Sequence, residues 1–220
     1  MSDGDAAIAG RRGLFVVFEG PEGAGKSTQI ARLAERMRSA GRDVLLTREP
    51  GGTRAGDAVR GVLLDPEQVI YPLTEFLLYS ASRAQLVAEV IGPALASGRD
   101  VVSDRFTGAS VAYQGYGRGL PLDLIDDLNR HATGGLRPDR TLLLDLDPAR
   151  GLARAAARSD HDRLEAAGLA FHQRARQGFL AQAASDEGWV VIDADADEVT
   201  VADAVWHAVE DLLAPAEEPR

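Results

Sequence analysis

A glycine-rich segment with a single lysine is the first stretch of the sequence that could do chemistry. Residues 20–27 read Gly-Pro-Glu-Gly-Ala-Gly-Lys-Ser and match the phosphate-loop pattern G-x-x-x-x-G-K-[ST] at every fixed position. Glycines let the backbone turn so that successive N–H groups point inward, and a following helix adds its positive end, so the segment can cradle a polyphosphate. Lys26, the only lysine of the chain, can reach the outer phosphates, and the Ser27 hydroxyl can ligate Mg²⁺. The alternative is a glycine turn that simply joins a strand to a helix.

Two polar segments each follow an apolar run. Residues 48–53 read Arg-Glu-Pro-Gly-Gly-Thr after the run at 43–47, and Asp104 lies at the end of another run that begins at Val101. Ligands of open α/β sheets bind at the carboxyl ends of the strands, so Arg48 is a candidate ligand-binding residue rather than only a surface charge. Phosphate-loop proteins use an Asp at the end of an apolar run to hold Mg²⁺, directly or through water, so Asp104 is a candidate metal ligand.

Tyr79 and Arg83 lie four positions apart in a long helical pattern and therefore share one helix face. Two interpretations remain open for them. The tyrosine packs on an arginine stem in the core, or a flat aromatic stacks a base beside a cation that binds the edge or the phosphate of the ligand.

The segment Arg150–Glu165 is rich in charge and has a weak apolar pattern. It contains Arg154, Arg158 and Arg163. It is either a solvated surface helix or a mobile lid that brings arginines onto transferring phosphates and excludes water, and we predict the lid.

Apolar periodicity predicts the elements that position these residues. Strands are expected at 14–18, 43–47, 101–105, 141–148 and 189–193. Helices are expected from the phosphate loop to Gly41 and at 56–64, 72–97, 121–131, 169–184 and 201–213, and a loop rich in Gly and Tyr is expected at 106–120. This alternation of strands and helices predicts a parallel sheet with helices on both faces.

Composition limits the class of protein. The 220 residues predict a single domain with a core over about 13–213 and short disordered tails. A net charge of −10 argues against a general binder of nucleic acid or of anionic membranes, and the absence of cysteine excludes disulfides and thiol chemistry. The N-terminus does not resemble a signal peptide, and no apolar stretch approaches the roughly 20 residues that span a bilayer, so a cytoplasmic location is predicted.

Three motifs together resemble the thymidylate kinase family of the bacterial type, and the similarity runs from about Leu14 to Leu213. They are Phe-Glu-Gly-Pro-Glu-Gly-Ala-Gly-Lys-Ser-Thr at 18–28, Thr-Arg-Glu-Pro-Gly-Gly-Thr at 47–53, and Asp-Arg-Phe at 104–106 followed by Ala-Tyr-Gln at 112–114. The resemblance implies the reaction of dTMP and ATP to dTDP and ADP with Mg²⁺. It also implies a nucleoside-monophosphate-kinase fold, a three-layer sandwich around a five-stranded sheet of order 2-3-1-4-5, and a homodimer.

The resemblance also implies roles for single residues. ATP and Mg²⁺ are held by the phosphate loop and the strand-end acid: Gly20, Pro21, Glu22, Gly23, Ala24, Gly25, Lys26, Ser27, Thr28 and Asp104. The acceptor is held by Glu22, Arg48, Tyr79, Arg83, Arg105, Ser110, Tyr113 and Gln114, with Arg105 also acting in catalysis. Tyr79 stacks thymine, Arg48 and Arg105 hold the acceptor phosphate, and a lid arginine, one of Arg154, Arg158 and Arg163, acts on the transferring group.

Family members often carry a serine where this chain has Ala109, with Ser110 one position later, which leaves that hydrogen bond to the substrate open. Competing functions are another small-molecule kinase of the same fold, an inactive relative, and a nucleotide-dependent switch. A GTPase switch would need an Asn-Lys-x-Asp segment, which a chain with its one lysine in the phosphate loop does not have.

Overall fold

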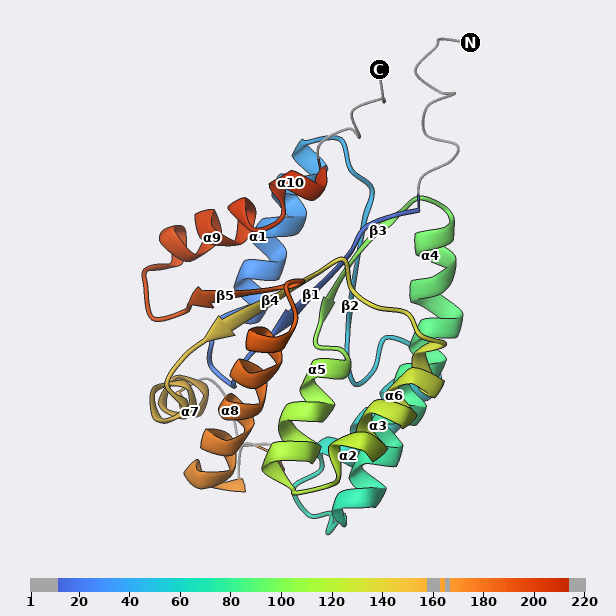
Figure 1. Cartoon of the computed structure of the whole chain (residues 1–220), viewed down its shortest axis with the longest axis vertical. Coiled ribbons are helices and arrows are strands. Elements are labelled where there is room, and N and C mark those ends of the chain that lie inside the picture. The colour runs from blue at the N-terminus through green and yellow to red at the C-terminus, as the bar shows by residue number, and fades with distance from the viewer. Residues whose placement is uncertain (1–11, 158–162, 165–166, 214–220) are drawn as a thin grey trace.

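The strands form one parallel sheet (Figure 1). The computed structural model describes residues 12–157, 163–164 and 167–213. The strands are β1 (Phe15–Glu19), β2 (Val44–Arg48), β3 (Asp100–Asp104), β4 (Arg140–Asp145) and β5 (Trp189–Asp193), in the order β2-β3-β1-β4-β5. Neighbouring strands pair in parallel, with Phe18 opposite both Asp104 and Leu142. The predicted fold and strand order are therefore confirmed.

Helices cover both faces of this sheet (Figure 1). One face is covered by α1 (Lys26–Ser39) and α9 (Glu198–His207), with α10 (Glu210–Leu213) beyond them. The other is covered by α3 (Pro72–Leu86), α4 (Gly92–Ala96), α5 (Thr107–Ser110), α6 (Leu122–Thr133) and α8 (Leu169–Ser185), and α2 (Arg54–Leu64) packs on α3. The short helix α7 (Pro148–Ala156) follows β4.

The central strand β1 determines which side chains enter which core. Successive side chains of a strand point to opposite faces. Val16 and Phe18 therefore enter the core with α1 and α9, whereas Phe15 and Val17 enter the core with α4. Glu19, the next residue on the Val17 side, is also fully buried. The strand thus places an acid inside the protein directly before the phosphate loop.

The long helix predicted at 72–97 is present, but its hydrogen bonding changes in the middle. A π-helical segment, η1 (Val87–Ile91), joins α3 to α4. Pro93 follows in the first turn of α4 and has no N–H to donate, so a change in the hydrogen-bond pattern just before it is expected.

The predicted loop at 106–120 is wrong. Residues Thr107–Ser110 form α5, and Val111–Gly117 continue it as a π-helical segment, η2. Glycines weaken a helix in isolation, but two of these are required by packing. A Cβ on Gly108 would lie 2.7 Å from the Trp189 ring, and a Cβ on Gly117 would lie 2.6 Å from the Phe171 ring. These two glycines are therefore required where the helix packs on β5 and α8, and they do not mark a loop.

The segment predicted as a lid is described only in part. Its first residues belong to α7, where the Asp147 side chain caps the helix by accepting from Ala149 N and Arg150 N. Residues 158–162 and 165–166, which include Arg158, lie outside the described part of the chain. The lid therefore stays a prediction.

Candidate active site

The phosphate loop connects β1 to α1 at the carboxyl edge of the sheet. Two of its glycines allow close backbone packing as well as positive φ angles, 138° at Gly20 and 70° at Gly23. A Cβ on Gly20 would lie 2.4 Å from Leu144 O, and a Cβ on Gly23 would lie 2.1 Å from Gly151 O. No side chain fits these positions, so the loop is fixed against β4 and α7 by its sequence.

Lys26, the first residue of α1, turns back over this loop. Its Nζ donates to Gly20 O at 3.1 Å and to Pro21 O at 2.9 Å, and the side chain is buried. Burial lowers the pKa of Lys26, the nearby Arg105 lowers it further, and Glu22 and Asp104 oppose this. The ammonium is thus held by two weak carbonyl partners, which an anion entering the loop can replace.

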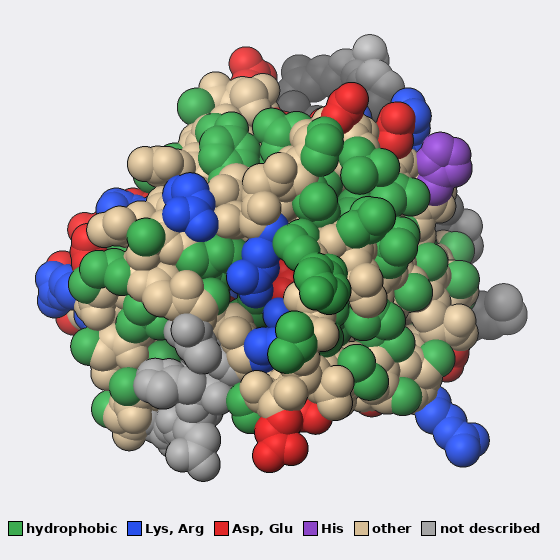
Figure 2. All heavy atoms as spheres, turned by 90° about the horizontal axis from the view of Figure 1, so that it is seen from below, with side chains coloured by type: hydrophobic (Ala, Val, Ile, Leu, Met, Phe, Trp, Pro, Cys, Tyr) green, Lys and Arg blue, Asp and Glu red, His purple; other side chains and the backbone are tan. Residues whose placement is uncertain are grey.

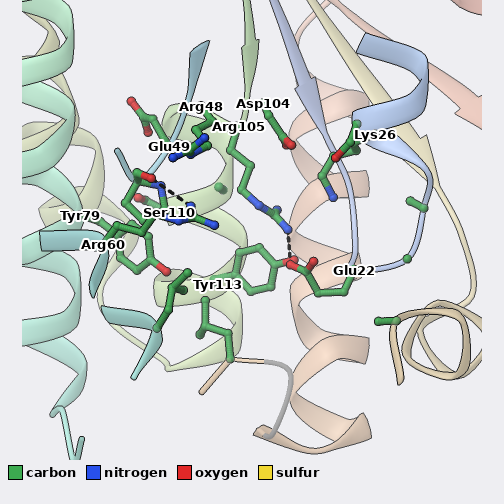
Figure 3. Close-up of a pocket in the computed structure, with 18 of the residues that line it drawn as sticks. Glu22, Lys26, Arg48, Glu49, Arg60, Tyr79, Asp104, Arg105, Ser110 and Tyr113 are labelled. Carbon is green, nitrogen blue, oxygen red and sulfur yellow. Dashed lines mark hydrogen bonds and ion pairs between the residues drawn. The ribbon is translucent and has the colours of Figure 1, made fainter. Parts of the chain in front are cut away.

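Arg105 lies directly after β3 and points between the phosphate loop and α3 (Figure 3). Its backbone has a φ of 71°, which is uncommon for a residue other than glycine and is typical of functional positions. Nη1 donates to Gly20 O at 3.1 Å, and Nη2 forms an ion pair with Glu22. Burial alone would raise the pKa of Glu22, but the attraction of Arg105 and Lys26 outweighs it and lowers that pKa. In this structure the partner of the Arg105 guanidinium is therefore the ionised Glu22 carboxylate.

Ser27 and Asp104 come together at the start of α1 and the end of β3. Both line the same cavity. Asp104 Oδ1 is buried and has no hydrogen-bond partner among the described residues. A hydroxyl and an acceptor-only carboxylate oxygen are ligands that Mg²⁺ prefers, so the residues present fit this cation.

A cavity of about 320 Å³ joins these groups. Most residues predicted for the site line it: Glu22, Gly23, Ala24, Gly25, Lys26, Ser27, Thr28, Arg48, Tyr79, Asp104, Arg105, Ser110, Tyr113 and Gln114. Seen from the carboxyl edge of the sheet, Lys and Arg side chains gather along the middle of the molecule (Figure 2). A protein with a net charge of −10 thus places several cationic side chains at this cavity.

Two tyrosine rings reach the cavity: Tyr113 lies beside Glu22 and Arg105, and Tyr79 lies on the opposite side, near Arg60 and Ser110 (Figure 3). Tyr79 of α3 and Tyr113 of η2 belong to one buried cluster with Leu164 and Phe171. The Arg105 guanidinium carbon lies 4.9 Å from the centre of the Tyr113 ring, and burial raises the pKa of the Tyr113 hydroxyl. Tyr79, Tyr113 and Leu164 thus line one part of the cavity, here called the aromatic slot, and the cation beside it is Arg105. The second interpretation of Tyr79 named Arg83 as this cation, and it stays a prediction.

Arg83 does not line this cavity. Its side chain is 1 % exposed and forms an ion pair with Glu49 at 2.7 Å. It also donates to Asn129 Oδ1 at 2.6 Å and to Ser110 Oγ at 3.1 Å. Burial raises the pKa of Glu49, and Arg83 opposes that rise. In this structure Arg83 contacts the site through Ser110 and Glu49, both of which line the cavity.

The described lid arginines also lie away from the phosphate loop. Arg154 donates to Ala194 O at 3.2 Å and pairs with Asp195, while Arg163 pairs with Glu75 at 2.6 Å. Arg48 lines the cavity but is more than half exposed and pairs with Asp57 at 3.5 Å.

Several contributors to the site were not predicted. The cavity is also lined by Glu49, Pro50, Arg60, Leu64, Ala109, Ala155 and Leu164. Arg60 lies on α2 and donates to Pro50 O at 3.0 Å, so it faces the loop that carries Arg48. The sequence held one signal for this arginine, because α2 follows that loop directly at the carboxyl edge of the sheet. Glu19, which lines a different cavity, was also not singled out, although an acid that closes an apolar strand is unusual.

Comparison with known proteins identifies relatives across almost the whole chain. The sequence profile of thymidylate kinase matches residues 18–205. A thymidylate kinase of Deinococcus radiodurans is 57 % identical over 199 residues, covering 90 % of this chain and 97 % of the relative. A thymidylate kinase of Halothermothrix orenii is 47 % identical over 205 residues, covering 92 % and 99 %. The crystal structure of thymidylate kinase from Ehrlichia chaffeensis superposes with a TM-score of 0.74 at 33 % identity, covering 90 % of this chain and 99 % of that one.

Proposed function

The chain belongs to the thymidylate kinase family, and we propose that it transfers the γ-phosphoryl group of ATP to dTMP, giving dTDP and ADP. An oxygen of the dTMP phosphate attacks the γ-phosphorus, and the bond from this phosphorus to the oxygen that bridges it to the β-phosphate breaks. The observation that carries the proposal is that one cavity contains two cationic positions, Lys26 at the phosphate loop and Arg105 between this loop and the aromatic slot. Such a transfer needs two anions held in line and charge to stabilise them.

The residues divide into a donor half and an acceptor half. The backbone N–H groups of the phosphate loop, in which Pro21 alone has none, and the Lys26 ammonium hold the polyphosphate of ATP. Arg48 and Arg105 hold the phosphate of dTMP, and Arg105 exchanges its Glu22 partner for that phosphate. Ser27 and Asp104 would hold Mg²⁺, which would supply positive charge against the phosphate oxygens.

The aromatic slot selects the nucleoside. Tyr79 stacks on the thymine ring, and Tyr113 lies against the deoxyribose, where it leaves little room for a 2′-hydroxyl group. Gln114 and Ser110 supply hydrogen-bonding groups in the same slot. A slot of this kind rejects purines by size, but it discriminates dTMP from dUMP, which lacks one methyl group, only by roughly 10- to 200-fold.

Exposed apolar side chains on three adjacent helices support a homodimer. They are Val62 on α2, Leu73 and Leu77 on α3, and Leu122 and Leu124 on α6, each between 36 % and 47 % exposed. Helix α3 contacts both α2 and α6, and apolar side chains gather on the corresponding side of the molecule (Figure 2). A contiguous apolar surface of this kind is typical of an interface. Size-exclusion chromatography with light scattering tests it: a monomeric mass at micromolar concentration would argue against the dimer.

No helix within the described ranges is long and apolar enough to cross a membrane. The cytoplasmic location stays a prediction.

A coupled ADP-release assay across nucleoside monophosphates tests the proposed function. The panel is dTMP, dUMP, dCMP, dAMP, dGMP and UMP, each with ATP and Mg²⁺. We expect dTMP to be best, dUMP weaker but detectable, UMP poor and the purines near background. A higher kcat/KM for dAMP or dCMP than for dTMP would refute the thymidylate assignment and favour another kinase of this fold.

A further inference from the structure

A buried carboxylate next to the aromatic slot, Glu75, holds three side chains: two from η2 and its C-cap, and a third from residue 163. Glu75 lies on α3 and is 0 % exposed. Its Oε1 accepts from Gln114 Nε2 at 2.8 Å and from Arg118 Nε at 3.2 Å. Its Oε2 accepts from Arg118 Nη2 at 3.1 Å and from Arg163 Nη1 at 2.6 Å. Glu75 does not line the cavity itself, so any effect on the ligand passes through these partners.

One of these partners, Gln114, does line the cavity. A side-chain amide can offer either its NH₂ group or its carbonyl oxygen, and its surroundings decide which way it turns. An ionised carboxylate accepts hydrogen bonds and donates none. Burial would raise the pKa of Glu75, but hydrogen bonds from Arg118 and Gln114 outweigh it and lower that pKa. Glu75 therefore fixes the NH₂ arm of Gln114 toward itself and leaves the carbonyl arm for a ligand.

The Arg163 contact fixes a second feature of the slot. The Arg163 guanidinium also donates from Nε to Leu63 O at 2.9 Å, so it is held between α2 and α3. Leu164, the next residue, lines the cavity and packs with Tyr79 and Tyr113. Arg163 is one of the three arginines among which the sequence predicts a lid residue that acts on the transferring phosphate, and this stays a prediction. In this structure its guanidinium anchors Leu164, one wall of the aromatic slot, to α2 and α3.

We propose that Glu75 is a positioning residue for acceptor selection: by orienting the amide of Gln114, it makes the slot offer a carbonyl oxygen to the base. Thymine and uracil carry an N–H donor at ring nitrogen 3, where cytosine carries a bare acceptor nitrogen. A carbonyl oxygen accepts a hydrogen bond from the N–H of thymine or uracil, whereas it repels the lone pair on the cytosine nitrogen. The inference rests on the proposed function, because it assumes that the base enters this slot.

The substitution Glu75→Gln tests this orientation, because it should reverse the amide of Gln114. The new side chain has one carbonyl, which is best placed where Oε2 now accepts from the two guanidinium groups of Arg118 and Arg163. Its NH₂ group then faces Gln114, which must turn its own carbonyl toward it and its NH₂ group toward the slot. The ratio of kcat/KM for dUMP to that for dCMP should fall by roughly tenfold or more, the factor that one hydrogen bond supplies.

A matched pair elsewhere in the chain provides the control. Gln85 donates to Glu89 at 2.7 Å on the exposed side of the same long helix, so Glu89→Gln makes the same chemical change away from the slot. This variant should keep the wild-type ratio. Loss of a purely structural contact would lower kcat/KM for both acceptors together and would not change their ratio.

A second variant keeps the inference testable if Glu75→Gln does not fold. Gln114→Met keeps the size of the side chain and removes the amide, so the ratio should again fall by roughly tenfold. An unchanged ratio in Glu75→Gln, or in Gln114→Met, would overturn the inference. In that case wild-type turnover of dTMP would still support the proposed function, whereas a wild-type protein that does not phosphorylate dTMP refutes the proposed function itself.

Discussion

Replacing Glu19 with glutamine should stabilise the protein at neutral and alkaline pH. Glu19 is fully buried, and its Oε1 accepts from Phe106 N at 3.0 Å and from Ala109 N at 2.9 Å. Its Oε2 has no hydrogen-bond partner among the described residues. Burial raises the pKa of Glu19 from 4.5 to about 7, although Arg105 opposes the rise. The folded protein therefore resists ionisation of a group that ionises freely in the unfolded chain.

The direction of the effect follows from proton binding in the two states. Below about pH 4.5 the carboxyl group is protonated in both states and does not affect stability. As the pH rises from about 4.5 to about 7, the unfolded chain releases this proton and the folded protein keeps it, so the free energy of unfolding falls. Above about pH 7 the loss is complete and constant. A rise in the pKa from 4.5 to about 7 corresponds to about 3 kcal/mol at roughly 1.36 kcal/mol per unit.

Glu19→Gln removes this loss and keeps the carbonyl oxygen that both backbone N–H groups need. Its NH₂ group can point into the second cavity that Glu19 lines, between α6 and α8. Urea unfolding of the wild type and the variant, at several values between about pH 5 and about pH 8, measures the effect. The stability difference in favour of the variant should grow with pH and level off above about pH 7. Glu35→Gln, a change at an exposed acid of α1, is the control. A stability difference that stays constant across the range would refute the reasoning.

Four further substitutions, at three positions, test other parts of the site. Lys26→Ala should abolish turnover and leave the protein folded. Lys26→Arg should also lose most of its turnover, because a guanidinium is wider than an ammonium and spreads its charge. Near-normal turnover in either variant would contradict the phosphate-loop role of Lys26. Tyr79→Ala should weaken dTMP binding by about 1–3 kcal/mol, the size of a lost base–aromatic stack. If calorimetry finds the same dTMP affinity in the variant and the wild type, the Tyr79 ring only packs in the core. Arg83→Met should lower the free energy of unfolding by about 3–5 kcal/mol, because it leaves Glu49 buried without its cation. An unchanged midpoint of urea unfolding would show that the Arg83–Glu49 ion pair does not stabilise the fold.

The acceptor slot depends on contacts that no local pattern reports. Tyr79 and Arg83 share a helix face and looked equivalent in sequence, yet Tyr79 lines the cavity and Arg83 is buried in a network with Glu49 and Asn129. The sequence placed Arg163 in the predicted lid and gave no sign that its guanidinium contacts Glu75, which lies 88 positions earlier. Partners this distant in the chain are brought together only by folding.

The sequence by itself determined the sheet, its carboxyl edge and the phosphate loop. Apolar periodicity and the glycine positions are local, and a strand followed by glycines and a helix has one way to place Lys26 and Ser27. The tertiary structure decided the rest. The glycine-rich stretch at 106–120 folds as a helix that packs so closely on the rings of Trp189 and Phe171 that no side chain fits at Gly108 or Gly117. The physical reason is that backbone turns depend on neighbouring residues, whereas burial, ion pairs and side-chain orientation depend on what the folded chain packs against them.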